Sequence, residues 1–272
     1  MTTPTRHWAS LKSPDFHALD LPRTIAVLPV AAIEQHGPHL PLNVDATLVD
    51  GVVAAALPHI PVAQPVLFLP TQAVGYSPEH TAFAGTLTLK AQTIIGLWTE
   101  LAESVAATGV KKLVLLNAHG GQVGLLDVVA RDLRARLGML VYSVNWFSLP
   151  LLDAAGVNVA SQFSAHEHRF GIHAGDMETS MMLALRPDQV DMAKAQNFES
   201  AAAHRATLFS LLGDGKSAKL AWQMQDYNPC GAVGNAAAAT AVKGHALLDA
   251  AGRSLAQLLG EIDRLPADTL RY

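Results

Sequence analysis

The chain has 272 residues, of which 50% are hydrophobic and 15% charged, and its formal net charge is −4. This composition predicts one globular domain over 1–272, and a weakly acidic chain without a Lys/Arg cluster gives no electrostatic reason to expect a nucleic acid or membrane partner. The single cysteine, Cys230, excludes an intrachain disulfide, and the first six residues lack the apolar core of a signal peptide, so we expect a cytoplasmic protein.

Apolar runs alternate with helical patterns along most of the chain. Strands are expected at 24–30, 66–70, 86–89, 112–117 and 139–144. Helices are expected at 46–57, 91–108, about 123–137, 177–185, 199–212 and 236–263, with an irregular segment at 146–172 that has the length of a lid or binding loop. Apolar strands that alternate with helices predict an α/β fold with a mostly parallel sheet covered on both faces.

The first expected strand leads directly into a stretch rich in possible metal ligands. Glu34 and His36 follow it within six residues, and Asp45 comes after a turn that contains Gly37 and Pro38. In an extended chain Glu34 and His36 share one face, and the two oxygens of Asp45 allow it to bridge two ions. Carboxylate oxygen and imidazole nitrogen suit zinc or manganese. The alternative is an ordinary loop in which Asp45 caps the following helix.

Two further polar clusters follow expected strands, Ser77 with His80 and then His119 with Gly120 and Gly121. Ligands of parallel α/β sheets bind at the carboxyl ends of the strands, so we expect these clusters to share one site with Glu34. The glycines allow a metal or substrate to approach the backbone closely, and no lysine follows them as in a phosphate-binding loop. A buried structural histidine is the alternative for His119.

The remaining candidates lie near the expected helix at 177–185. His173 precedes it and Glu178 lies in its first turns, a spacing that suits a proton shuttle followed by a metal ligand. A carboxylate is also favoured there by the helix dipole, a role that we assign to Asp176. Ser77 lacks the surroundings of a nucleophilic serine and is expected to bond to substrate, and Cys230 is interpreted as a packed side chain.

Four motifs together resemble the creatininase (creatinine amidohydrolase) family over residues 24 to 258. They are Glu34-Gln35-His36-Gly37-Pro38-His39-Leu40-Pro41 with Asp45; Ser77-Pro78-Glu79-His80 with Gly85-Thr86; Asn117-Ala118-His119-Gly120-Gly121; and His173-Ala174-Gly175 with Glu178-Thr179-Ser180. The resemblance implies a three-layer α/β/α sandwich, two divalent ions per subunit and a homohexamer.

The resemblance also implies how the ligands are shared. One ion takes Glu34, Asp45 and His119; the other takes His36, Asp45 and a carboxylate. In creatininase that carboxylate lies two residues after the motif histidine, where this chain has Gly121, and Glu178 is the candidate replacement. Arg169 stands where creatininase has a lid tryptophan. These differences indicate a family member other than creatininase proper.

The predicted function is hydrolysis of a small, cyclic amide by hydroxide held between two ions of zinc or manganese, with iron as a further possibility. His173 and Glu178 are the predicted catalytic residues. The residues expected to contact the small-molecule substrate are Ser77, His80, Gly120, Gly121 and Arg169. Alternatives are deformylation of a formamide, ring opening of a cyclic sugar derivative and, in another class, a non-catalytic protein that binds metal or a small ligand.

Overall fold

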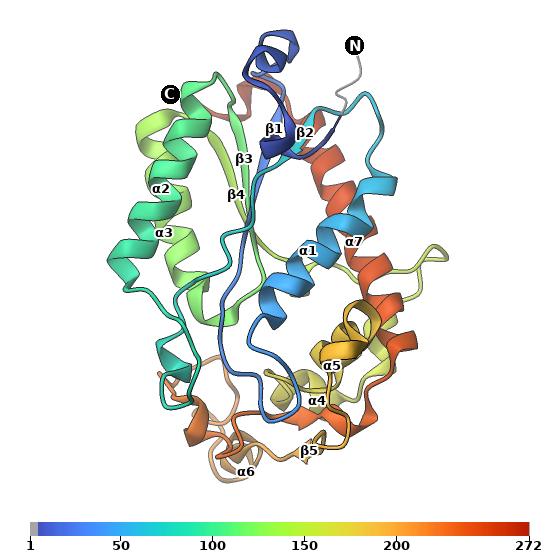
Figure 1. Cartoon of the computed structure of the whole chain (residues 1–272). Helices are drawn as coiled ribbons and strands as arrows, with labels where there is room; N and C mark the ends of the chain where they lie inside the picture. The colour runs from blue at the N-terminus through green and yellow to red at the C-terminus, as the bar shows by residue number, and fades with distance from the viewer. Residues whose placement is uncertain (1–4, 272) are drawn as a thin grey trace.

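The computed structural model describes residues 5–271, so residues 1–4 of the N-terminal stretch discussed above lie outside it. Its centre is a parallel sheet in the order β2-β1-β3-β4 (Figure 1). The strands are β1 (Ile25–Val30), β2 (Val66–Phe68), β3 (Lys112–Asn117) and β4 (Leu140–Asn145). Ile25 is in register with Val66 on one side and Lys112 on the other. The expected parallel α/β fold is confirmed.

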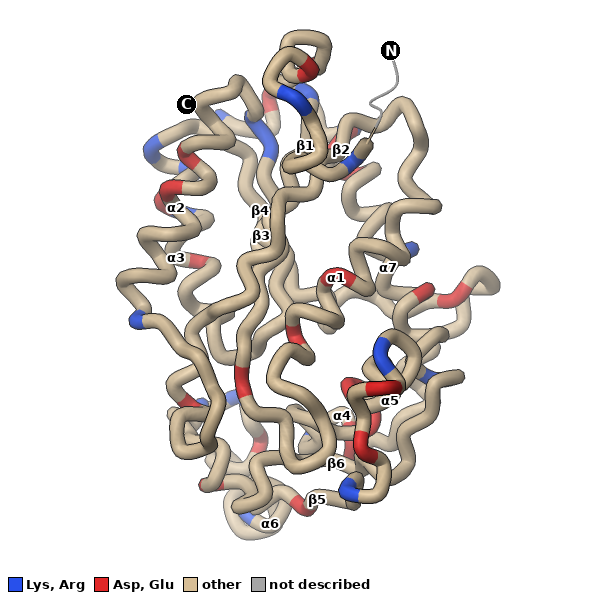
Figure 2. The backbone as a smooth tube through the Cα atoms, in the orientation of Figure 1, with Lys and Arg blue, Asp and Glu red and all other residues tan. Residues whose placement is uncertain are grey.

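Helices cover both faces of the sheet, which gives the three layers. Helices α2 (Ala91–Ala107) and α3 (Val123–Leu137) lie on one face, and α1 (Val44–Ala56) and α7 (Ala241–Arg264) on the other (Figure 1). Alternate residues of β1 enter the two cores: Ile25 contributes to that of α1 and α7, and Leu28 to that of α2 and α3. Every residue of β1 is therefore buried, and the charged positions in Figure 2 largely avoid the sheet.

The smaller elements gather beyond the carboxyl ends of the strands, at the lower end of Figure 1. They are α4 (Ala165–Phe170), α5 (Asp176–Leu185), α6 (Ala201–Leu208) and the antiparallel pair β5 (Asn197–Phe198) and β6 (Gly234–Asn235). The segment 146–172, expected to be irregular, contains two 3-10 turns and α4. In the described part of the chain, no helix is both long and apolar enough to cross a membrane.

Several local predictions were wrong. Thr86 to Leu89 is no strand, because its pairing is limited to one bridge between Leu87 and Ile33. The closing helix begins at Ala241, where the Thr240 side chain accepts the N–H of Lys243 as an N-cap. Cys230 is exposed rather than packed, because its own N–H is bonded to the Asn228 side chain in a surface turn.

Helix α7 approaches its neighbours closely because glycines face them. A Cβ atom at Gly244 would overlap the carbonyl oxygen of Ser180 in α5, and one at Gly252 would overlap Ala55 in α1. A salt bridge of 2.6 Å between Lys243 in α7 and Asp176 in α5 also joins these two helices. Helix α5 is therefore fixed against α7 by backbone contact and by an ion pair.

We predict that Gly244→Ala lowers the free energy of unfolding by about 1–3 kcal/mol, because the added methyl group has no space between α7 and α5. Gly96→Ala in α2 is the matched control: its Cβ meets nothing within 4 Å, and helix propensity should raise stability by up to about 1 kcal/mol. Chemical denaturation followed by circular dichroism measures both. Equal effects of the two variants would contradict the close packing of α7.

Candidate metal centre

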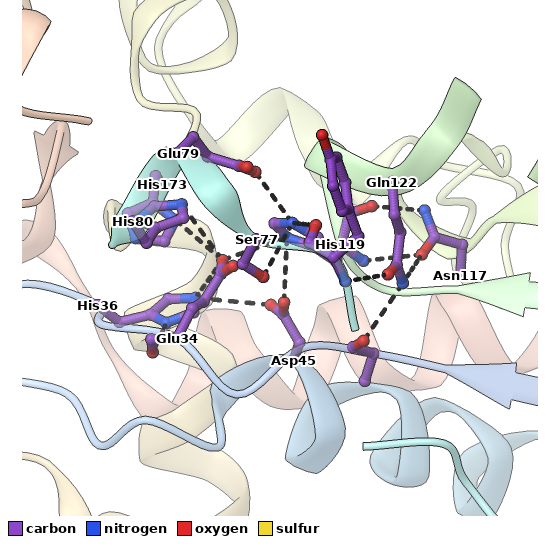
Figure 3. Close-up of polar contacts among 12 residues, drawn as sticks. Glu34, His36, Asp45, Ser77, Glu79, His80, Asn117, His119, Gln122 and His173 are labelled. Carbon is purple, nitrogen blue, oxygen red and sulfur yellow. Dashed lines mark hydrogen bonds and ion pairs between the residues drawn. The ribbon is translucent and has the colours of Figure 1, made fainter. Parts of the chain in front are cut away.

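Imidazoles and carboxylates converge beyond the carboxyl ends of β1 and β3 (Figure 3). Glu34 and His36 come from the segment after β1, Asp45 from the first turn of α1, and His119 from the residues after β3. All of these side chains are at most 5% exposed. Buried carboxylates are costly unless a positive charge accompanies them, so the composition of this cluster calls for cations.

The first candidate pocket lies between Glu34, Asp45 and His119. His119 Nδ1 is 3.2 Å from Glu34 Oε1 and 3.3 Å from Asp45 Oδ2. Ligands held about 2.1 Å from a tetrahedral ion are about 3.4 Å from one another, so this spacing fits a shared ion. The pocket also contains Glu34 Oε2, a buried oxygen without a hydrogen-bond partner among the described residues. The three residues therefore fit a divalent cation.

The second candidate pocket lies around His36. Its Nδ1 is 3.0 Å from the carbonyl oxygen of Glu34, to which Nδ1–H donates, and this leaves the Nε2 lone pair free to bind a metal. His36 Nε2 is 3.5 Å from Asp45 Oδ1 and 4.0 Å from Glu178 Oε2. Asp45 thus presents one oxygen to each pocket, which is the arrangement of a bridging carboxylate.

Protons and metal ions compete for the imidazole nitrogens and carboxylate oxygens of the two candidate pockets. Burial alone raises the pKa of Asp45, but hydrogen bonds with His119 and His36 outweigh burial and lower it to about 2. Burial lowers the pKa of His36, but Asp45 and Glu178 raise it to about 9. Protonated imidazoles therefore neutralise the carboxylates when no metal is bound. Ligation requires neutral imidazole, so divalent ions would displace these protons.

Glu178 reaches the second pocket from the first turn of α5. Its Oε2 accepts the N–H of Ala174 at 2.5 Å, which fixes the carboxylate against the backbone. The side chain is 21% exposed, through the neighbouring cavity. Desolvation, and then the nearby Asp45 and Glu34, raise the pKa of Glu178 to about 7, although His36 opposes them. The structure thus brings the predicted replacement carboxylate to the predicted pocket.

Glu79 is a residue that the sequence analysis missed. Its Oε1 is 3.0 Å from His119 Nε2, on the side of the ring away from Asp45 (Figure 3). His119 Nε2–H is hydrogen-bonded to the carbonyl oxygen of Tyr76 at 3.1 Å, which fixes the tautomer, so Glu79 acts on the ring through its negative charge. A Cβ atom at Gly121 would overlap Glu79 Oε1, so the glycine makes room for this contact. The available signal was the position of Glu79 beside His80, in the 3-10 turn Pro78–His80.

Gln35 was also missed, and it holds the two remaining histidines of the cluster. Its side-chain Nε2 is 2.8 Å from His80 Nδ1, and its backbone carbonyl oxygen is 2.8 Å from His173 Nε2. The other ring nitrogens face Glu34 Oε1, at 3.5 Å for His80 and 3.8 Å for His173. Burial, followed by the charge of His36, lowers the pKa of His173 well below its usual value. His173 is therefore neutral at pH 7.

A cavity of about 550 Å³ opens over the cluster. Of the residues expected at the substrate, His80, Gly120 and Gly121 line it. Ser77 does not: it is fully buried, with Oγ 3.3 Å from His119 Nε2. Arg169 does not line it either, because Nη2 donates to the carbonyl oxygen of Gly213 at 2.8 Å. The apolar lining residues larger than alanine are Trp146, Phe147, Leu149, Pro150, Leu151, Ile172, Met177 and Trp222.

Buried imidazoles and carboxylates at the strand ends of a parallel α/β sheet are typical of metal-dependent hydrolases. The model of the Creatininase family, described as creatinine amidohydrolase, matches residues 9–259. The chain therefore belongs to the creatininase family and is a hydrolase.

Relatives within the family have different names. The mycofactocin precursor peptide peptidase of Mycobacterium ulcerans is 34% identical over 225 residues, which are 80% of this chain and 77% of the relative. Creatinine amidohydrolase of Pseudomonas putida is 32% identical over 180 residues, 62% of this chain and 66% of the relative. The chain is thus similar both to a peptidase and to the enzyme that gives the family its name.

Solved structures agree on the fold. A creatininase variant of Zn–Zn type has a TM-score of 0.76 at 24% identity, covering 97% of this chain and 100% of that one. A structure described as creatininase with Mn has a TM-score of 0.72 at 23% identity, covering 96% and 100%. The descriptions of these two structures name zinc and manganese.

We predict that Glu79→Gln weakens metal binding by roughly 10–100-fold, because the neutral amide removes the negative charge 3.0 Å from His119 Nε2 that makes this ring a stronger ligand. Glu100→Gln on the exposed surface of α2 is the control and should bind metal like the wild type. Titration with zinc in a metal-buffered solution measures the affinity. Equal affinity of Glu79→Gln and the wild type would show that His119 does not depend on Glu79.

Proposed function

We propose that this protein hydrolyses an amide carbon–nitrogen bond with two divalent cations, zinc or manganese with iron as a further possibility, bound on either side of Asp45. One ion would be held by Glu34, Asp45 and His119 and the other by His36, Asp45 and Glu178. The observation that carries the proposal is the position of the Asp45 carboxylate, 3.3 Å from His119 and 3.5 Å from His36.

Metal ions bound here would lower the pKa of water and polarise a substrate carbonyl group. The proposed role of the protein's own side chains is to transfer a proton from the attacking water to the leaving nitrogen. His173 Nε2–H donates to the carbonyl oxygen of Gln35, so Nδ1 is the free nitrogen and faces the cluster. A neutral imidazole there accepts a proton from the attacking water and passes it to the leaving nitrogen, which departs poorly without one. Glu178 orients that water.

The size of the cavity indicates how large the substrate can be. The small cyclic amide expected from the sequence would occupy only part of about 550 Å³, a volume in the range of sites for drug-sized ligands. Eight apolar lining side chains larger than alanine, including Trp146, Phe147 and Trp222, also suit a larger substrate. Together with the similarity to a peptide peptidase, the cavity favours a linear amide or the end of a short peptide.

We predict that chelation abolishes hydrolysis of model amides, that zinc or manganese restores it, and that Asp45→Asn loses both ions together with activity, because Asp45 serves both pockets. Asp50→Asn, on the exposed side of the same helix, is the control and keeps metal and activity. Elemental analysis and an amide hydrolysis assay measure the two quantities. Chelator-resistant turnover by the wild type would contradict the proposal.

We predict that His173→Ala keeps its metal content but slows turnover by roughly a hundredfold or more, because proton transfer to the leaving group is lost. His245→Ala, on the exposed side of α7, should have wild-type rates. Steady-state kinetics and elemental analysis of the same preparations separate the two effects. Full activity of His173→Ala would remove this residue from the mechanism.

A further inference from the structure

A second cavity, of about 310 Å³, adjoins the one over the metal centre. The two share three lining residues, Ile172, Lys219 and Trp222, so they form neighbouring parts of one depression. The walls of the second cavity come from the end of α4, from α6 and from the segment 212–222. A substrate bound at the metal centre can therefore extend into this second cavity.

The second cavity is strongly basic, although the chain as a whole is acidic. Its lining includes the cations Arg169, Arg205, Lys216 and Lys219. Asp214 is the one carboxylate in that lining, and it is engaged by Ser217 Oγ and by the N–H groups of Lys216 and Ser217. The cations therefore outnumber the carboxylate in a small volume.

These cations also form no close ion pairs among the described residues. None of the four forms an ion pair within 4.0 Å with any residue between 5 and 271. Elsewhere on the surface, arginines such as Arg23, Arg131 and Arg253 are each bonded to an aspartate. An unpaired group of cations beside a substrate cavity is available to bind an anion.

Aromatic rings hold the two guanidinium groups. Arg205 lies over the ring of Tyr227, with Cζ 5.5 Å from its centroid, and Arg169 lies over Phe170 at 4.8 Å. Arg169 is further fixed by its hydrogen bond to Gly213. Stacked guanidinium groups keep N–H donors free at their edges, and planar donors of this kind match the oxygens of a carboxylate or phosphate. This arrangement differs from that of freely solvated surface lysines.

We propose that the second cavity binds a terminal oxyanion, carboxylate or phosphate, of the substrate whose amide bond lies at the metal centre. The inference rests on the proposed function and narrows it: the substrate carries a negative charge some distance from the scissile bond. Trp222, shared by both cavities, would contact the part of the substrate that joins the two groups. Arg169, expected at the substrate from its place in the sequence, would act here and not beside the metals.

The test compares the same amide substrate with and without its terminal charge. An N-acetylated dipeptide with a free carboxylate, its C-terminal amide, and an N-acyl amino-alkyl phosphate are assayed with the metal-loaded enzyme. Arg205→Gln and Lys219→Gln are compared with Arg131→Gln, whose side chain lies on α3 and pairs with Asp127. Lys219 is exposed, so its variant reports on binding even if Arg205→Gln is destabilised.

The wild type should prefer an anionic substrate to its neutral counterpart, and Arg205→Gln and Lys219→Gln should each reduce this kcat/KM preference by about tenfold, whereas Arg131→Gln preserves it. Preference for the carboxylate or for the phosphate identifies the source of the anion. An unchanged preference in both cavity variants, with hydrolysis still sensitive to chelator, would overturn the anion site and leave the proposed function standing.

If no model amide is hydrolysed, a direct binding measurement tests the proposed anion site. Calorimetric titration of the metal-loaded protein with inorganic phosphate should show weaker binding in the variant that combines Arg205→Gln with Lys219→Gln than in Arg131→Gln. Phosphate bound to the metals contributes equally to both. Identical isotherms for the two proteins would contradict the proposal independently of any catalytic assay.

Discussion

The structure depends on one electrostatic constraint: Glu34 and Asp45 are at most 2% exposed and lie beside four imidazoles, those of His36, His80, His119 and His173, at the edge of the cavity. Isolated carboxylates in such a place would cost several kcal/mol each. The imidazoles compensate them when protonated, and two divalent ions would do so with better geometry, because Asp45 offers one oxygen to each side. The other features of the site hold these groups in position.

The sheet and one layer of helices together position this cluster. The segments after β1 and β3 deliver Glu34, His36 and His119 because parallel strands end at the same edge of the sheet. Glu178 comes from α5, whose place is set by α7: Lys243 bonds to Asp176, and the N–H of Thr240 to Ser180 Oγ. The C-terminal helix, distant in sequence, thus helps to position Glu178, the proposed ligand of the second pocket.

Much of the site could be predicted from the sequence, and the reason is physical. Continuous apolar runs marked the strands, so the polar residues directly after them had to meet at one edge, as Glu34, His36 and His119 do. Glu79 and Gln35 escaped prediction because they act through His119, His80 and His173, and contacts of this kind depend on side-chain directions.

The substrate contacts were harder to predict for the same reason. Ser77 and Arg169 lie near the site in sequence, but Ser77 packs behind His119 and Arg169 turns towards Gly213. The direction of Arg169 is set by the fold of 146–172 and 212–222, segments without a repeating apolar pattern, and that of Ser77 by its contacts with Thr88 and His119. The basic cavity is likewise assembled from separate segments, none of which is a cluster of charge by itself.

The most direct test of the account is anomalous diffraction from crystals of the protein grown with manganese. The account predicts two anomalous peaks in each subunit, about 3.5–4 Å apart as in other two-metal sites, with the Asp45 carboxylate between them and His119 and His36 on opposite sides. A single peak, or peaks away from Asp45, would contradict it.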